Sequence, residues 1–76
     1  MIMECIGTDV TKELIREISR KRIARNVGLT ISAINAWTQR GMPIRYALLF
    51  KTIYPHLLTW GDYPEVYKRL EEFEGK

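Results

Sequence analysis

The chain has 76 residues, of which 46% are hydrophobic and 28% are charged, and its net charge is +3. This length supports one hydrophobic core, so residues 1–76 are predicted to form a single domain, and no apolar run approaches the roughly 20 residues that cross a bilayer. A single cysteine and a single histidine exclude an internal disulfide and a plausible zinc site, which favours a reducing, cytoplasmic setting without membrane association.

The start of the chain predicts a helix over about residues 9–18. Apolar side chains recur there every four residues, at Val10, Leu14 and Ile18. A side-chain oxygen of Thr8 or Asp9 can accept a hydrogen bond from a backbone amide of the first turn, so either residue can cap this helix.

Two shorter helices are predicted next, over residues 20–27 and 31–40. Ser19 precedes the first of them as a cap, and Gly28 follows it as the residue that takes the left-handed conformation at a helix end. Thr30 caps the second helix, which stops at the sequence "GMP". Each helix therefore has a signal for its start and its end.

The second half of the chain predicts two more helices and a connector. Residues 43–54 begin with a proline suited to a first helical turn, end before Pro55, and carry an apolar face of Ile44, Ala47, Leu48, Phe50, Ile53 and Tyr54. Residues 56–63, "HLLTWGDY", suit a short strand as well as a helix end, and we predict a non-helical connector. A last helix begins at Pro64, with an apolar stripe at Val66, Leu70 and Phe73. The predicted class is all-α with about five helices.

Two short helices joined by a glycine-containing turn form the helix-turn-helix pattern, which we predict over about residues 20–40. The crossing of the two helices requires a small residue, which is Ala24, and the turn contains Gly28. The core of such a motif requires apolar residues, which are present at Ile23, Val27, Leu29, Ile34 and Trp37.

The second of these helices has a polar face opposite its apolar one. At about 100° per residue, the arc that faces away from the core contains Ser32, Asn35, Ala36, Gln39 and Arg40. The amides of Asn35 and Gln39 can bond adenine, the Ser32 hydroxyl can bond a base or a phosphate, and Ile31 or Ala36 can touch a thymine methyl. We therefore predict a base-reading set of Ile31, Ser32, Asn35, Ala36 and Gln39. The alternative is that the amides are ordinary solvent-exposed side chains.

The charges are segregated along the chain. Residues 10–51 carry a net charge of +7 and the remainder carries −4, which favours a nucleic acid as partner. Cations in the first turn of a helix oppose its dipole at about 0.3–1 kcal/mol each, and a bound phosphate compensates them. The predicted phosphate contacts are Arg20, Lys21, Arg22, Arg40 and Arg45. Arg40 can also bond a guanine. The alternative for the basic run Arg20, Lys21 and Arg22 is an ordinary solvent-exposed face of the helix.

The stretch "RIARNVGLTISAINAW" resembles the helix-turn-helix of the phage lambda Cro type of repressor, whose second helix carries a similar "SAIN" run. The resemblance covers about Arg20–Pro43 and implies a lambda repressor-like, Cro-like fold with Ile31, Ser32, Asn35 and Ala36 facing the bases. Ile31 stands where relatives commonly have Gln, and Ala36 where a Lys can occur, so no operator sequence is implied. "WTQRGMPIRYALLF" also resembles the YdaS-like prophage proteins, which share the motif and are sometimes described as antitoxins.

We therefore expect a sequence-specific regulator of transcription that binds double-stranded DNA, a Cro-like repressor of a phage or prophage. A single domain makes few base contacts, so a homodimer on half-sites about 34 Å apart is expected. His56 and Cys5 have no suitable catalytic partner nearby in sequence, so no enzyme activity, cofactor or small-molecule substrate is expected. The alternative is a protein-binding module, an antitoxin or an inhibitor of a host factor, that uses an aromatic C-terminal segment with Trp60, Tyr63, Tyr67 and Phe73.

Overall fold

The computed structural model describes residues 4–75, which form six helices and no β-strand. In chain order the helices are α1 (Thr8–Ile18), α2 (Arg20–Val27), α3 (Ile31–Arg40), α4 (Ile44–Ile53), α5 (Leu58–Asp62) and α6 (Pro64–Glu74). The predicted all-α class is confirmed for the described residues, but the predicted number of helices is one too few. The additional helix is α5, which lies within residues 56–63, so the prediction of a non-helical connector there was wrong.

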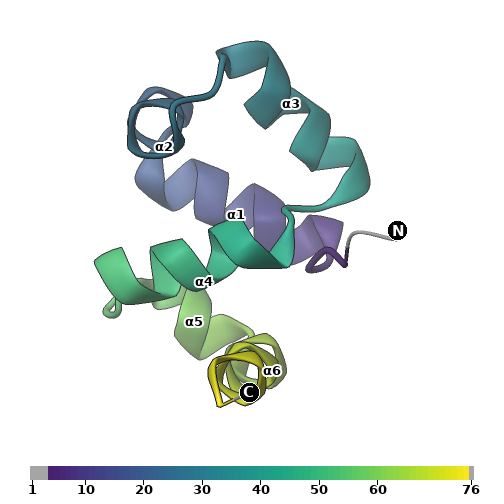
Figure 1. Ribbon diagram of the computed structural model, residues 1–76, viewed down its shortest axis with the longest axis vertical. Coiled ribbons are helices and arrows are strands. Elements are labelled where there is room, and N and C mark those ends of the chain that lie inside the picture. The colour runs from purple at the N-terminus through teal and green to yellow at the C-terminus, as the bar shows by residue number, and fades with distance from the viewer. Residues whose placement is uncertain (1–3, 76) are drawn as a thin grey trace.

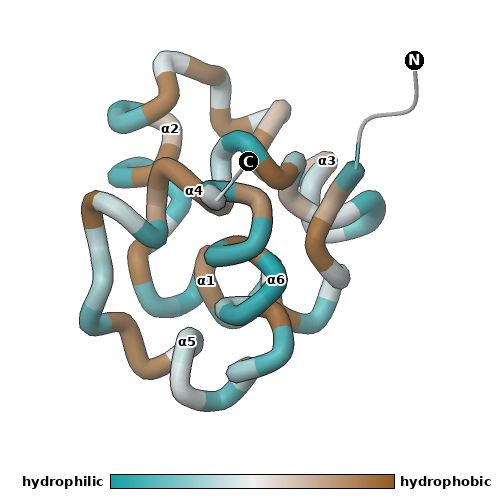
Figure 2. The backbone as a smooth tube through the Cα atoms, turned by 60° about the horizontal axis from the view of Figure 1, so that its bottom comes forward, coloured by the Kyte–Doolittle hydropathy of each residue, from teal (hydrophilic) through white to brown (hydrophobic). Residues whose placement is uncertain are grey.

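The helices are arranged around one core (Figure 1). α2 and α3 lie at one end of the molecule, α6 lies at the opposite end, and α1 and α4 lie between them. Hydrophobic and hydrophilic stretches alternate along α1 and α4, as expected of helices that bury one face (Figure 2). The core consists of buried side chains from every helix, from the N-terminal segment and from the loop between α3 and α4: Ile6, Val10, Leu14, Ile15, Ile18, Ile23, Ile34, Trp37, Met42, Ile44, Ala47, Phe50, Trp60 and Leu70.

The boundaries of α2 and α3 follow the predicted caps. The Ser19 hydroxyl accepts a hydrogen bond of 3.3 Å from the backbone N–H of Arg22, and the Thr30 hydroxyl accepts one of 3.2 Å from that of Ala33. Gly28 ends α2 with a φ of 70°, in the left-handed region that glycine adopts without strain. The signals for these two helices are therefore local and are used as predicted.

The boundaries of α1 and α4 differ from the prediction. α1 begins at Thr8 with Gly7 as its N-cap and without a side-chain cap, so the predicted cap at Thr8 or Asp9 was wrong, because both residues lie inside the first turn. α4 begins at Ile44, one residue after the proline that was predicted to be its first residue. Ile53 is 44% exposed, because it lies about 180° around α4 from the buried Ile44.

Hydrogen bonds from the N-terminal segment and from α1 hold the loop between α3 and α4, directly after the end of α3. The backbone N–H of Ile6 donates to the carbonyl of Met42 (2.9 Å), and the N–H of Ile44 donates to the carbonyl of Glu4 (3.0 Å). The buried hydroxyl of Thr11 accepts a hydrogen bond of 2.9 Å from the N–H of Met42, which joins α1 to the same loop. Gly41 lies in this loop with a φ of 91°, and a Cβ atom there would overlap the carbonyl oxygen of Ile6. Only glycine fits this position.

Candidate nucleic-acid interface

α2 and α3 are neighbouring helices that hold each other through a small apolar contact. Ile23 of α2 and Ile34 of α3 are fully buried, and Trp37 is 7% exposed. Ala24 is half-buried at the contact, and its carbonyl accepts the backbone N–H groups of Gly28 (2.8 Å) and Leu29 (3.2 Å). Ile23, Ile34 and Trp37 are therefore buried, as their spacing along the sequence predicted.

The Trp37 ring connects α3 to α4. Its centroid lies 5.2 Å from that of Tyr46, with the two rings tilted by 31°, and the guanidinium carbon of Arg45 lies 4.9 Å from the Tyr46 ring centroid. Arg45 also donates a hydrogen bond of 3.2 Å to the Tyr46 hydroxyl. The contact between Trp37 and Tyr46 therefore holds the buried face of α3 against α4. The guanidinium group of Arg45 lies next to this contact.

The opposite face of α3 is exposed and has no acidic residue. All five residues of the predicted base-reading set are exposed: Ile31, Ser32, Asn35, Ala36 and Gln39. The buried residues of α3, Ile34 and Trp37, lie on the other side of the helix. The structure thus brings the five side chains together on one accessible surface that carries no negative charge of its own.

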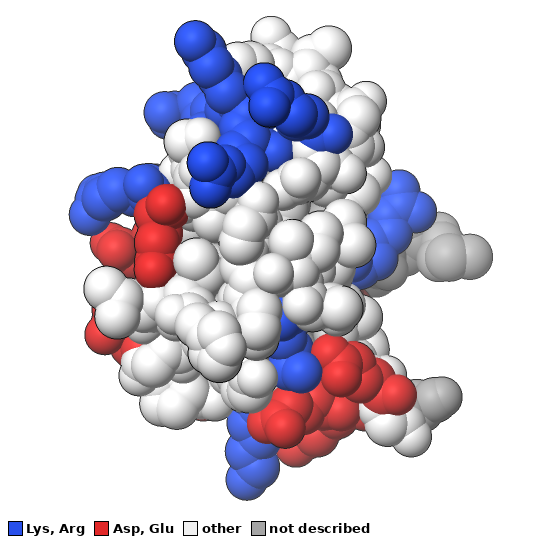
Figure 3. Space-filling model, turned by 90° about the vertical axis from the view of Figure 1, so that its left-hand side faces the viewer, with Lys and Arg blue, Asp and Glu red and all other residues white. Residues whose placement is uncertain are grey.

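The five predicted phosphate contacts are exposed as well: Arg20, Lys21, Arg22, Arg40 and Arg45. Three ion pairs join described residues, Glu13–Arg16, Lys51–Glu74 and Glu4–Arg69, and none of them includes a predicted phosphate contact. Seen from the α2 side, Lys and Arg side chains gather at the end of the molecule that holds α2 and α3, whereas many acidic side chains gather over α6 at the opposite end (Figure 3). The segregation of charge along the sequence is therefore a segregation in space.

A hydrogen bond that the sequence did not indicate joins the two predicted sets. The Nε of Arg20 donates to the Oδ1 of Asn35 at 2.6 Å. The guanidinium group keeps its remaining donors, and the Asn35 amide keeps its NH₂ group. Arg20 therefore fixes the orientation of a predicted base-reading side chain while its own charge stays exposed.

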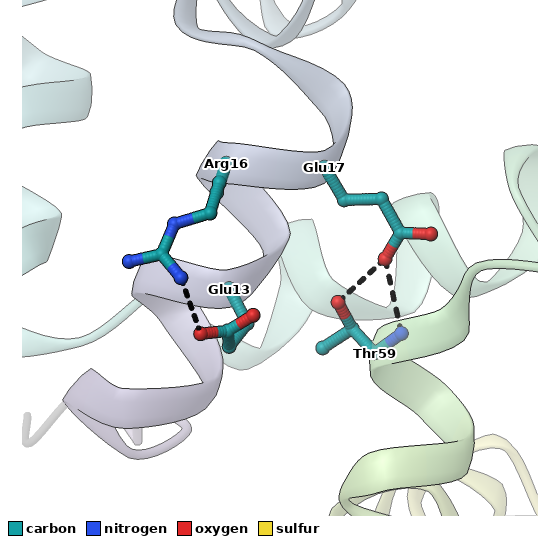
Figure 4. Close-up of polar contacts among 4 residues, drawn as sticks. All are labelled: Glu13, Arg16, Glu17 and Thr59. Atoms are coloured by element: carbon teal, nitrogen blue, oxygen red, sulfur yellow. Dashed lines mark hydrogen bonds and ion pairs between the residues drawn. The ribbon is translucent and has the colours of Figure 1, made fainter.

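Glu17 is a second residue whose role was missed. Its carboxylate accepts hydrogen bonds from the N–H group (3.0 Å) and the hydroxyl (2.6 Å) of Thr59 (Figure 4). It also accepts one from the N–H group of Leu58 (2.7 Å), so it caps α5. Desolvation raises the pKa of Glu17, but these hydrogen bonds from Thr59 and Leu58 outweigh it and leave the pKa below its usual value. No sequence signal could reveal this contact, because Leu58 and Thr59 lie 41 and 42 residues after Glu17 in the chain.

The aromatic residues of the C-terminal segment pack against the protein's own core. Trp60 is 5% exposed, and its Nε1 donates a hydrogen bond of 2.8 Å to the carbonyl of Tyr54. Tyr63, Tyr67 and Phe73 are half-buried against the same core. The large hydrophobic side chains that are exposed within residues 4–75 are instead Ile31, Leu49, Ile53 and Leu58.

The described residues contain no group of three or more His, Cys, Asp or Glu side chains that could hold a metal ion. His56 is exposed, and Cys5 is half-buried where its backbone forms an isolated bridge with Pro43. Within residues 4–75, no helix has the length and apolar character needed to cross a membrane. No family model, no curated protein and no solved structure matches the chain.

Proposed function

We propose that this protein is a sequence-specific regulator of transcription that binds double-stranded DNA by inserting α3 into the major groove. The observation that carries the proposal is the exposed face of α3, which has no acidic residue and is bordered by cations without ion-pair partners among residues 4–75. The major groove admits a helix of this kind and displays donors, acceptors and methyl groups that polar and small side chains can read.

The roles of the side chains follow from their chemistry. Asn35 and Gln39 donate to and accept from base edges, Ser32 bonds a base or a phosphate, and the side chains of Ile31 and Ala36 touch a thymine methyl group. The cations hold the backbone of the duplex, which fixes the position of α3 without reading sequence. These cations are Arg20, Lys21, Arg22, Arg40 and Arg45.

Two copies are proposed to act together, as in a Cro-like repressor of a phage or prophage in the bacterial cytoplasm. The molecule measures 31 × 30 × 20 Å. Half-sites one helical turn apart are separated by about 34 Å, so two copies of this size fit next to each other on one side of a duplex. A protein-binding module that works through Trp60, Tyr63, Tyr67 and Phe73 has less support, because these aromatic rings pack against the protein's own core.

The first test is a gel shift with random duplex DNA at low salt, which should detect binding that weakens steeply as salt is added. Operators selected from a random pool then provide the substrate for Asn35→Ala. Loss of the amide should remove about 1–3 kcal/mol of discrimination between the operator and an unrelated duplex at one fixed salt concentration. Non-specific binding should survive, because the cations remain.

Two matched variants accompany Asn35→Ala. Lys21→Ala should weaken binding to both duplexes about equally and reduce the salt slope by about one unit. Asn26→Ala removes an exposed amide that bonds the Tyr54 hydroxyl and lies outside α3, so discrimination should not change. Equal losses on both duplexes for Asn35→Ala would show that this face does not read sequence. No shift of the wild-type protein at low salt would contradict DNA binding itself.

A further inference from the structure

A hollow of about 360 Å³ lies where α1, the start of α2 and α3 meet. It is lined by Lys12, Ile15, Arg16, Arg20 and Thr38. Three of these five side chains are cationic, and they come from two different helices. Lys12, Arg16 and Arg20 are all exposed, so the hollow is open to a ligand from solvent.

The acidic residues of α1 leave the hollow with a positive charge. Glu13 pairs with Arg16 at 3.0 Å, so it offsets one cation. The carboxylate of Glu17 points to α5 (Figure 4), where it accepts three hydrogen bonds from Leu58 and Thr59. Lys12 and Arg20 take part in no ion pair among residues 4–75. Asp9, the third acidic residue of α1, does not line the hollow and joins no ion pair among residues 4–75. The three cations of the lining therefore outnumber the one carboxylate that pairs with them, and the hollow suits an anion.

The position of the hollow relates it to the exposed face of α3. Thr38 lies within it and donates a hydrogen bond of 2.7 Å to the carbonyl of Asn35, and Arg20 is bonded to the Asn35 side chain. The hollow therefore borders the Asn35 edge of that face. Arg40 lies about 140° around α3 from Asn35, so it belongs to the other edge. Cations thus border both edges of the face, as the two phosphate strands border a major groove.

We propose that this hollow receives a phosphate of the DNA backbone, on the strand that passes along the Asn35 edge of α3, with Lys12 and Arg16 of α1 as contacts. The inference rests on the proposed function and extends it to a helix outside the helix-turn-helix pair. Arg20 couples phosphate binding to base reading, because its side chain faces the phosphate in the hollow and also orients the Asn35 amide toward the groove.

The test measures the affinity for a non-specific duplex as a function of salt concentration. Lys12→Ala should reduce the magnitude of the slope of log K against log salt by about 0.9. With affinity at 1 M salt unchanged, this corresponds to a loss of about eightfold at 0.1 M salt. Arg16→Ala should weaken binding as well, because it removes a cation and leaves Glu13 without its partner.

Two further variants separate this site from general effects of charge and folding. Glu13→Gln removes the adjacent carboxylate and should strengthen binding, an effect of opposite sign that loss of structure cannot produce. Lys68→Ala removes one exposed cation of α6 and should leave the slope unchanged. If Lys12→Ala and Arg16→Ala behave as Lys68→Ala does while the wild-type protein binds DNA, the inference is overturned and the proposed function stands. If the wild-type protein binds no duplex, the proposed function fails and this inference fails with it.

Discussion

The α2–α3 pair and the α5–α6 pair differ in where the residues that define them lie in the sequence. α2 and α3 begin at hydroxyl caps directly before them, Ser19 and Thr30, and α2 ends at Gly28. α5 has no cap of its own, and its first turn is held by Glu17 of α1. The first pair is thus specified locally, whereas the second depends on contacts that form only when the chain is folded.

The two pairs also present different surfaces. The cations of α2 and the uncharged face of α3 are exposed, while few side chains of the pair, Ile23, Ile34 and Trp37, are buried. α5 and α6 turn their aromatic rings to the core and expose the acidic residues of α6. One end of the molecule therefore exposes cations and uncharged side chains, whereas the other end exposes acidic side chains.

The largest effect is expected at Trp37, which joins the α2–α3 pair to α4. Its ring is buried between α3 and Tyr46 of α4, so Trp37→Ala should lower the free energy of unfolding by about 3–5 kcal/mol. Leu58→Ala is the matched control, because Leu58 is 77% exposed and its removal should change stability by less than about 0.5 kcal/mol. Urea denaturation measures both. Equal midpoints for the two variants would show that α3 does not rest on this ring.

The second prediction compares two glycines. Gly41→Ala places a Cβ atom against the Ile6 carbonyl at a positive φ, and the backbone strain alone should cost about 1–3 kcal/mol. Gly61 lies within α5 with no atom within 4 Å of an added Cβ, so Gly61→Ala should stabilise the protein by about 0.5–1 kcal/mol. Thermal unfolding followed by circular dichroism measures both changes. A destabilised Gly61→Ala protein would argue against a helical α5.

Much of the first half of the molecule could be predicted because its signals are local. Cap residues, Gly28 and the apolar spacing specify α2 and α3 to the residue, and the same spacing predicted that Ile34 and Trp37 are buried. The exposure of the predicted base-reading and phosphate-contacting residues follows from the same helical geometry. What these residues bind remains a proposal.

The rest could not be predicted because it depends on contacts between distant residues. The short run "LTWGD" contains a glycine and lacks a local cap, so nothing in its own sequence favours a helix. The hydrogen bond between Arg20 and Asn35 spans 15 residues, and that from Met42 to Thr11 spans 31. Helical spacing indicates which face of a helix is buried, but not which side chain of another helix lies opposite it.

The smallest effect tests the contact on which α5 depends. Glu17→Gln keeps one acceptor oxygen and replaces the other by an NH₂ group, which cannot accept the N–H of Leu58 or Thr59. By analogy with the loss of a helix cap, this should cost about 0.5–2 kcal/mol at pH 7. Glu72→Gln, at an exposed position of α6, should change stability by less than about 0.5 kcal/mol.

The pH dependence gives this prediction its sign. Because the folded pKa of Glu17 lies below its ordinary value of 4.5, the carboxylate stabilises the fold fully above that pH. The contribution is lost as the pH falls through the folded pKa, where protonation leaves a carboxylic acid that resembles the amide of Glu17→Gln. Melting temperatures of the wild-type and variant proteins should therefore differ at pH 7 and converge as the solution is acidified well below pH 4.5. A difference that stays constant across this range would mean that the charge of Glu17 does not hold α5 against α1.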